Sequence, residues 1–163
     1  MATVIADNIH YSAEALIKAP PAIVWDILTD YRNGHPKILP PAFRDFTVES
    51  GGKGGGTVIH YTFHAAGTTR HIRHLVSEPE TGHVLVESAP GDPTRTSFTL
   101  TPAADGSQTR LQITTVQTTP PGPVGAITRL LVPFFAPTIQ RIYQDEMRRL
   151  DDLAQHWPTA ANG

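Results

Sequence analysis

The last long apolar pattern of the chain constrains its fold more than any other feature. Between Phe135 and Trp157, apolar residues recur at the spacing of an α-helix, and charged residues fill the opposite face. The predicted apolar face contains Phe135, Ile139, Ile142, Tyr143, Met147, Leu150, Leu153 and Trp157. A helix with one apolar face is stable only when that face packs against other structure. We therefore expect one long helix that rests on the segments before it.

Those earlier segments alternate with a period of two residues, which is typical of β-strands. Short strands separated by turn residues favour an antiparallel meander. Prolines 20 and 21 suit a helix start, and we expect two short helices between Pro21 and Leu39, whereas Met1 to Asn8 look like a loose leader. The expected strands are His10–Lys18, Phe43–Ser50, Thr57–His64, Thr69–Ser77, His83–Ser88, Thr96–Thr101 and Arg110–Thr118.

Two prolines stand at the start of the expected long helix. Pro133 and Pro137 each lack the backbone N–H that a helix interior uses. We therefore expect the apolar segment from Val124 to Val132 to be separate from the helix or kinked against it.

Composition narrows the class of protein. At 163 residues the chain suffices for one domain with a sizeable core, and we expect a single domain over residues 1–163 with an ordered core of about 10–157. With a net charge of −2, the chain has no basic excess to attract nucleic acid. Without cysteine, neither a disulfide nor a thiolate site can form. We find no signal peptide and no apolar run of membrane-spanning length, so we expect a cytoplasmic protein without stable membrane insertion.

One segment near the N-terminus has a family resemblance. Residues 17–31, IKAPPAIVWDILTDY, follow a strand-Ala-Pro-x-x-x-Val-Trp pattern that resembles the polyketide cyclase/dehydrase and lipid transport proteins of the START-like, Bet v 1-like superfamily (SRPBCC). The resemblance extends from His10 to Trp157. It implies an α+β helix-grip fold, in which a seven-stranded antiparallel sheet wraps around the C-terminal helix and encloses a hydrophobic cavity. Functions within this superfamily range from ligand binding to catalysis, so the fold alone does not select one.

Glu146 is the first candidate for chemistry, because it interrupts the apolar face of the long helix. A carboxylate buried there must either shift its pKa or find a cation. One interpretation is a structural ion pair with an Arg or His of the sheet, or a carboxylate at a wet cavity mouth. The other is a cavity group that orients a ligand or acts as an acid or base.

The histidine-rich hairpin supplies the second candidate. If Ala66-Gly67 is a two-residue turn, Thr62 lies opposite His71 and His60 lies opposite Arg73. One face of the hairpin is then apolar, and only His74 and Arg70 are strongly polar there. We therefore take these two as candidate partners for Glu146, with the polar end of a ligand as the alternative, and we take Glu146 and His74 as the catalytic candidates. The other face contains His60, His64 and His71, but no nearby acidic residue joins them, so we predict a solvated face and no metal.

The remaining site residues follow from strand parity. Phe98 and Leu100 share one face of their strand, and Leu111 and Ile113 share one face of the next. Such an apolar wall with a few polar groups is typical of a small-molecule site. The predicted ligand-binding residues are Tyr61, Phe63, Ile72, His74, Phe98, Leu100, Ile113, Ile139, Tyr143, Glu146 and Met147.

Three functions fit these residues. The first is a binding protein for a hydrophobic or aromatic, lipid- or polyketide-like molecule. The second is a cyclase or dehydratase that uses the same cavity without a cofactor, with Glu146 or His74 as the acid or base. The third is a protein-interaction module with a filled core. The sequence selects neither the ligand nor the oligomeric state.

Overall fold

The computed structural model describes residues 1–158, and residues 159–163 of the predicted domain lie outside this description. Along the chain, the strands are β1 (Ala2–Ile5), β2 (Asn8–Ile17), β3 (Phe43–Ser50), β4 (Val58–Ala65), β5 (Thr68–Glu80), β6 (Val84–Ser88), β7 (Thr94–Ala103) and β8 (Gln108–Thr118). The helices are α1 (Pro21–Thr29), α2 (His35–Ile38), a short 3-10 helix η1 (Ala104–Gly106) and α3 (Pro123–Ala154).

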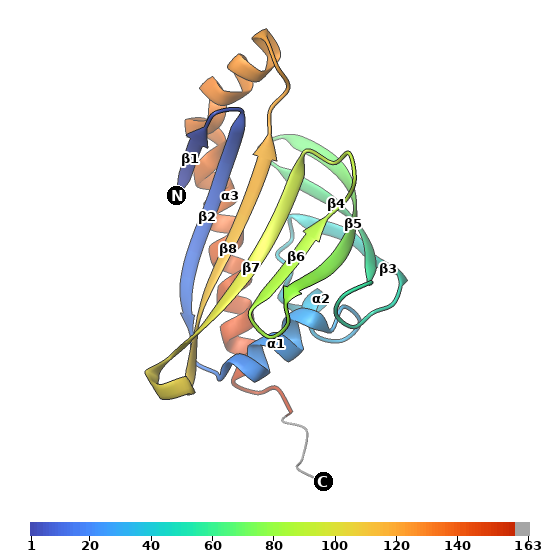
Figure 1. Ribbon diagram of the computed structural model, residues 1–163, viewed down its shortest axis with the longest axis vertical. Coiled ribbons are helices and arrows are strands. Elements are labelled where there is room, and N and C mark those ends of the chain that lie inside the picture. The colour runs from blue at the N-terminus through green and yellow to red at the C-terminus, as the bar shows by residue number, and fades with distance from the viewer. Residues whose placement is uncertain (159–163) are drawn as a thin grey trace.

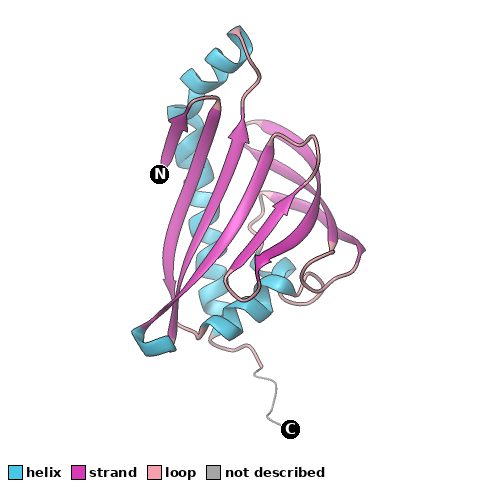
Figure 2. Ribbon diagram, in the orientation of Figure 1, coloured by secondary structure: helices cyan, strands magenta, loops and turns pink. Residues whose placement is uncertain are grey.

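The strands form one antiparallel sheet with the order β1-β2-β8-β7-β6-β5-β4-β3. The sheet curves around α3, and α1 and α2 close one end of the space between them (Figures 1 and 2). The predicted helix-grip fold is confirmed. The core lies between the concave face of the sheet and α3, where Leu111, Met147 and Leu150 are almost fully buried.

The sheet has eight strands within residues 1–158, one more than predicted. The predicted loose leader contains β1, whose residues Ala2 to Ile5 pair with Tyr11 to Asn8 of β2. Most side chains of this edge strand are exposed. Because an exposed four-residue strand needs no apolar alternation, its sequence carries no period of two.

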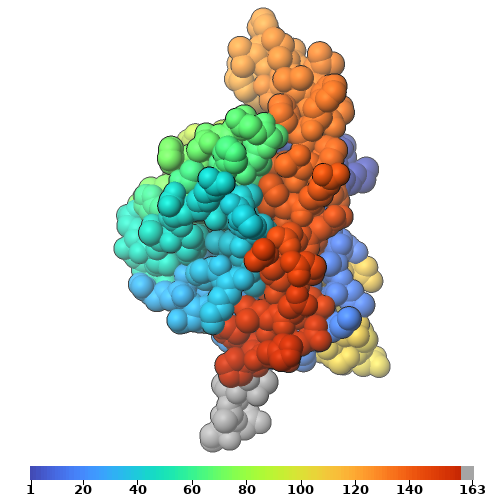
Figure 3. Space-filling view, turned by 180° about the vertical axis from the view of Figure 1, so that it is seen from behind, coloured from blue at the N-terminus to red at the C-terminus, as the bar shows by residue number. Residues whose placement is uncertain are grey.

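Helix α3 begins at Pro123, twelve residues before the predicted start. It includes the segment that we expected to be separate from the helix or kinked against it. Pro133 and Pro137 lie inside it, and both are exposed. The carbonyl groups that these prolines leave without a helical donor can therefore be hydrated. The start of α3 projects beyond the sheet (Figures 1 and 3), and Leu130 and Phe134 are exposed there.

Candidate functional site

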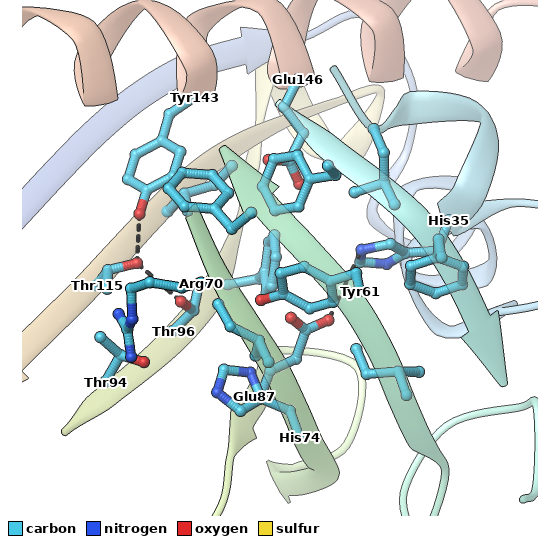
Figure 4. A pocket seen from close by; sticks show the side chains of 18 residues that line it. His35, Tyr61, Arg70, His74, Glu87, Thr94, Thr96, Thr115, Tyr143 and Glu146 are labelled. Atoms are coloured by element: carbon cyan, nitrogen blue, oxygen red, sulfur yellow. Dashed lines mark hydrogen bonds and ion pairs between the residues drawn. The ribbon is translucent and has the colours of Figure 1, made fainter. Parts of the chain in front are cut away.

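A cavity lies between the sheet and α3. Its volume, counted as the space that the centre of a water molecule can occupy, is about 70 Å³. A single water needs only ~10–15 Å³ on this measure, so the cavity has room for several waters or for a small ring. Figure 4 shows the lining side chains: His35, Leu39, Phe43, Phe46, Ile59, Tyr61, Phe63, Arg70, Ile72, His74, Glu87, Thr94, Thr96, Phe98, Ile113, Thr115, Tyr143 and Glu146.

The β4–β5 hairpin supplies much of the apolar wall. Ala65 pairs with Thr68, which makes Ala66-Gly67 the two-residue turn, and both residues have a positive φ as such a turn requires. Thr62 lies opposite His71 and His60 opposite Arg73, as predicted. This register directs Ile59, Tyr61, Phe63, Ile72 and His74 to the cavity. A shift of one residue would have directed the polar face inward.

Most residues predicted to bind ligand line the cavity, and three do not. Those that line it are Tyr61, Phe63, Ile72, His74, Phe98, Ile113, Tyr143 and Glu146. Leu100 and Met147 are buried in the packed core instead, and Ile139 is a half-buried residue packed against that core. Leu100 has the correct parity but pairs with Leu111, which is also fully buried. Parity therefore identifies the inner face of a strand, but not how far along the strand the cavity extends.

Glu146 enters the interior from the middle of α3. The residue is only 3% exposed, and among the described residues its carboxyl group makes no hydrogen bond or ion pair. Burial raises its pKa to about 8, and the nearby Glu87 adds to the shift. The carboxyl group is therefore mostly protonated at neutral pH, and it is available to a molecule in the cavity.

A second buried carboxyl group, that of Glu87, was missed by the sequence analysis. Glu87 lies on β6 and shares an inward parity with Leu85, and this parity was the signal that could have identified it. Tyr31 donates a hydrogen bond to Glu87 Oε1 at 2.7 Å, and His35 Nε2 lies 3.6 Å from the same oxygen. Unlike Glu146, Glu87 thus has polar neighbours within the protein.

His35 is held in place from its other ring nitrogen. Its Nδ1 lies 2.8 Å from the carbonyl oxygen of Leu28, a geometry in which Nδ1–H donates to the carbonyl. The ring also stacks on Tyr31, with centroids 4.6 Å apart. The end of α1 and the start of α2 therefore orient Nε2 of His35 toward Glu87.

The predicted pairing of Glu146 with His74 or Arg70 is wrong. Arg70 instead forms an ion pair with Asp92 at 3.3 Å, and His74 Nε2 lies 3.8 Å from the same carboxylate. Neither His74 ring nitrogen has a hydrogen-bond partner in the described chain, and neither is accessible. Burial lowers the pKa of His74, so the ring is neutral at pH 7. Asp92 lies in the loop after β6, and sequence periodicity does not place a loop residue beside a particular strand.

Hydroxyl groups line the side of the cavity beneath Tyr143. The Tyr143 hydroxyl lies 2.5 Å from Thr115 Oγ1, which lies 2.8 Å from Thr96 Oγ1 (Figure 4). Burial raises the pKa of Tyr143, so this phenol stays protonated at neutral pH. The cavity thus has aromatic walls, hydroxyl groups along one side and carboxyl groups on α3 and β6.

The outer face of the hairpin differs from the prediction in one respect. Glu49 of β3 contacts His60 and forms an ion pair with Arg73 at 2.7 Å, so an acidic residue does lie beside the histidines. His71 and His64 contact threonine hydroxyls instead. Within residues 1–158, no three side chains of the metal-ligating types converge.

A curved antiparallel sheet that grips one long helix, with a lined cavity between them, is the helix-grip architecture. The sequence profile of the family described as polyketide cyclase/dehydrase and lipid transport matches residues 8–155. The chain therefore belongs to this family. No curated protein matches the sequence significantly.

Solved structures resemble the chain along nearly its whole length. The KanY protein shares 26% identity at a TM-score of 0.73, with 90% of this chain and 97% of that chain covered. The ZhuI aromatase/cyclase from Streptomyces sp. R1128 shares 16% identity at a TM-score of 0.65, covering 96% and 99%. The protein TTHA0849 from Thermus thermophilus shares 17% identity at a TM-score of 0.67, with 92% of this chain and 99% of that chain covered. The last two likenesses support the fold alone. No helix in the described part of the chain is long and apolar enough to cross a membrane.

Proposed function

We propose that the protein binds a small hydrophobic molecule with an aromatic ring and one polar end. The observation that supports this proposal most is the cavity itself, in which aromatic walls surround a carboxyl group that has no partner among the described residues. Phe43 lies 5.3 Å from the ring of Tyr61 and 5.0 Å from that of Phe63, so a planar ligand can pack against several aromatic faces. A volume of about 70 Å³ favours one ring over a long acyl chain.

The test fills the cavity by enlarging one side chain of its wall. Ile72 lines the cavity, whereas Leu75 lies on the same strand but is 45% exposed. Ile72→Trp should fill the space, and Leu75→Trp is the matched control. We expect 2-phenylethanol, a neutral one-ring probe, to shift the amide NMR signals of residues around the cavity in the wild type and in Leu75→Trp. Ile72→Trp should weaken this binding at least tenfold. Equal binding by both variants, or no binding by the wild type, would reject the proposal.

A second candidate function is favoured by the protonation state of Glu146. Because its pKa is about 8, this carboxyl group can donate a proton near neutral pH and accept it back. An intramolecular aldol condensation of a poly-β-carbonyl chain, followed by loss of water, needs such an acid and base. In this alternative, Glu146 is the catalytic group, and the buried nitrogens of His74 make that residue the weaker candidate.

Turnover distinguishes the enzyme from the binding protein. A linear poly-β-carbonyl thioester incubated with the protein should lose the mass of one water molecule as its ring forms. Glu146→Gln should abolish this mass change and leave 2-phenylethanol binding intact. Equal product formation with and without the protein would reject the catalytic alternative and leave the binding proposal standing.

A further inference from the structure

Some of the charged groups that line the cavity have a partner of opposite charge, and others do not. Two buried carboxyl groups face it, those of Glu87 and Glu146, which are 5% and 3% exposed. Arg70 also lines the cavity, but its guanidinium group binds Asp92. His35 and Tyr31 contact Glu87. Glu146 therefore has no cation beside it among the described residues.

The other titratable groups around the cavity do not supply that cation. His74 is neutral, and neither of its ring nitrogens is accessible. Tyr61 and Tyr143 both have raised pKa values, so they remain neutral phenols. A buried carboxylate without a partner is costly, and a ligand cation could provide the missing charge.

The aromatic groups around the cavity also favour a cation. Tyr61 stacks on Phe46 at 6.4 Å between centroids and lies beside Phe43. The faces of such rings carry a negative electrostatic potential, which attracts ammonium groups and repels carboxylates. The aromatic faces and the two carboxyl groups therefore both favour a positively charged ligand over a negatively charged one.

We propose that the cavity selects a small aromatic amine in its protonated form, with the ammonium group at Glu146, and that it excludes aromatic carboxylates. This inference rests on the proposed binding function and specifies the class of ligand. The hydroxyl groups of Tyr143 and Thr115 lie on the adjoining side of the cavity and can accept further hydrogen bonds from the ammonium group.

Binding of an amine changes the protonation of Glu146. At pH 7 the free protein holds a proton on this carboxyl group, and a primary amine with a pKa of roughly 10 is already an ammonium ion. When the ammonium group reaches Glu146, the carboxyl group ionises and its proton passes to the buffer. No proton is released when a neutral alcohol binds. Among the other titratable groups that line this space, Glu87 contacts Tyr31 and His35, and Arg70 contacts Asp92.

The experiment compares three ligands of similar shape: 2-phenylethylamine, 2-phenylethanol and phenylacetate. Titration calorimetry at pH 7 in two buffers of different ionisation enthalpy measures both affinity and proton release. We expect the amine to bind at least tenfold more tightly than the alcohol and to release close to one proton on binding. The affinity for the amine should exceed the affinity for phenylacetate by a still larger factor. Glu146→Gln should reduce the preference for the amine to less than threefold and remove the proton release. Glu14→Gln, on the outer face, is the matched control and should leave both unchanged.

The outcomes separate this inference from the proposed function. If the alcohol binds as tightly as the amine, or phenylacetate binds best, the charge selection is wrong while aromatic binding stands. If an amine preference survives in Glu146→Gln, the role of Glu146 is wrong. If none of the three ligands binds, the proposed function itself fails. A thermal unfolding curve of Glu146→Gln with a native-like transition establishes that a lost preference does not come from unfolding.

Discussion

At the scale of single residues, the two cavity carboxyl groups differ in how the protein compensates them. Glu87 accepts a hydrogen bond from Tyr31 and faces His35, whereas Glu146 lies among apolar and aromatic side chains. Glu146 was predicted from the sequence because one carboxylate interrupts a long apolar stripe. Glu87 was not predicted, because β6 has only five residues and both of its faces contain a buried apolar residue, Leu85 on one and Val86 on the other. So short a strand shows little alternation.

The raised pKa of Glu146 predicts a pH dependence of stability. Its pKa rises from 4.5 to about 8 on folding, so the folded chain holds this proton more tightly than the unfolded chain. The associated stabilisation is lost as the pH rises from the unfolded value through the folded one. We expect the unfolding free energy to fall by an amount of the order of 4 kcal/mol between pH 4 and pH 9 from this group alone.

Two variants check this pH dependence by urea unfolding. Glu146→Gln should flatten the decline relative to the wild type, because it keeps the shape and removes the titration. Glu146→Leu should unfold at the same urea concentration as the wild type at pH 5 and at a higher one at pH 8. If both variants were destabilised at pH 8, Glu146 would be half of a structural ion pair instead.

At the scale of elements, the phase of α3 determines which residues reach the interior. Leu150 is fully buried, and the Arg148 side chain is 61% exposed and pairs with Asp145 and Asp152 on the helix surface. The predicted phase of the helix is therefore correct over this part. Its start was predicted too late, because the two prolines suggested a break where the exposed side of the helix in fact tolerates them.

Substitutions on opposite faces of α3 should differ strongly in their effect on stability. We expect Leu150→Ala to lower the unfolding free energy by roughly 2–5 kcal/mol, because it leaves a cavity in a packed core. Arg148→Ala should change it little, because exposed ion pairs contribute little to stability. Urea unfolding of both variants is the measurement, and equal midpoints would contradict the helix phase.

The hairpin formed by β4 and β5 is the element that the sequence predicted most closely. Its turn residues are adjacent in the chain, and Gly67 can adopt the positive φ that a two-residue turn needs. Once the turn is fixed, every cross-strand pair follows from counting. The partner of a residue outside the hairpin does not follow in this way, and this is why Asp92 beside Arg70 and Glu49 beside His60 were not predicted.

At the scale of the whole molecule, a hydrogen bond joins the segment that follows α3 to the first helix. Trp157 Nε1 donates a hydrogen bond to Asp26 Oδ2 at 2.7 Å, and Lys53 Nζ lies 2.5 Å from the other carboxylate oxygen. The two interactions hold the pKa of Asp26 below its usual value. Residues from three distant parts of the chain therefore meet at the end of the molecule where α1 lies (Figure 1).

Trp157→Phe tests whether the hydrogen bond between Trp157 and Asp26 stabilises the fold. The substitution keeps an aromatic ring beneath Lys37, which lies 5.6 Å above the tryptophan, and removes only the N–H donor and part of the ring. We expect a loss of about 1 kcal/mol of unfolding free energy. In a double-mutant cycle with Asp26→Asn, the two losses should not add, because both substitutions weaken the same hydrogen bond. Additive losses would show that the bond does not contribute to stability.

The amino-acid sequence by itself determined the features that depend on neighbours along the chain. These are the face of α3 that is buried, the inward face of the β4–β5 hairpin and the entry of Glu146 into the interior. Only the tertiary structure decided what surrounds those groups, since Glu87, Asp92 and Glu146 come from separate elements and the curvature of the sheet sets their spacing. A pKa and a ligand preference depend on such through-space charges and on burial. Periodicity fixes which way a side chain points, but it contains no information about the distance to a charge on another element.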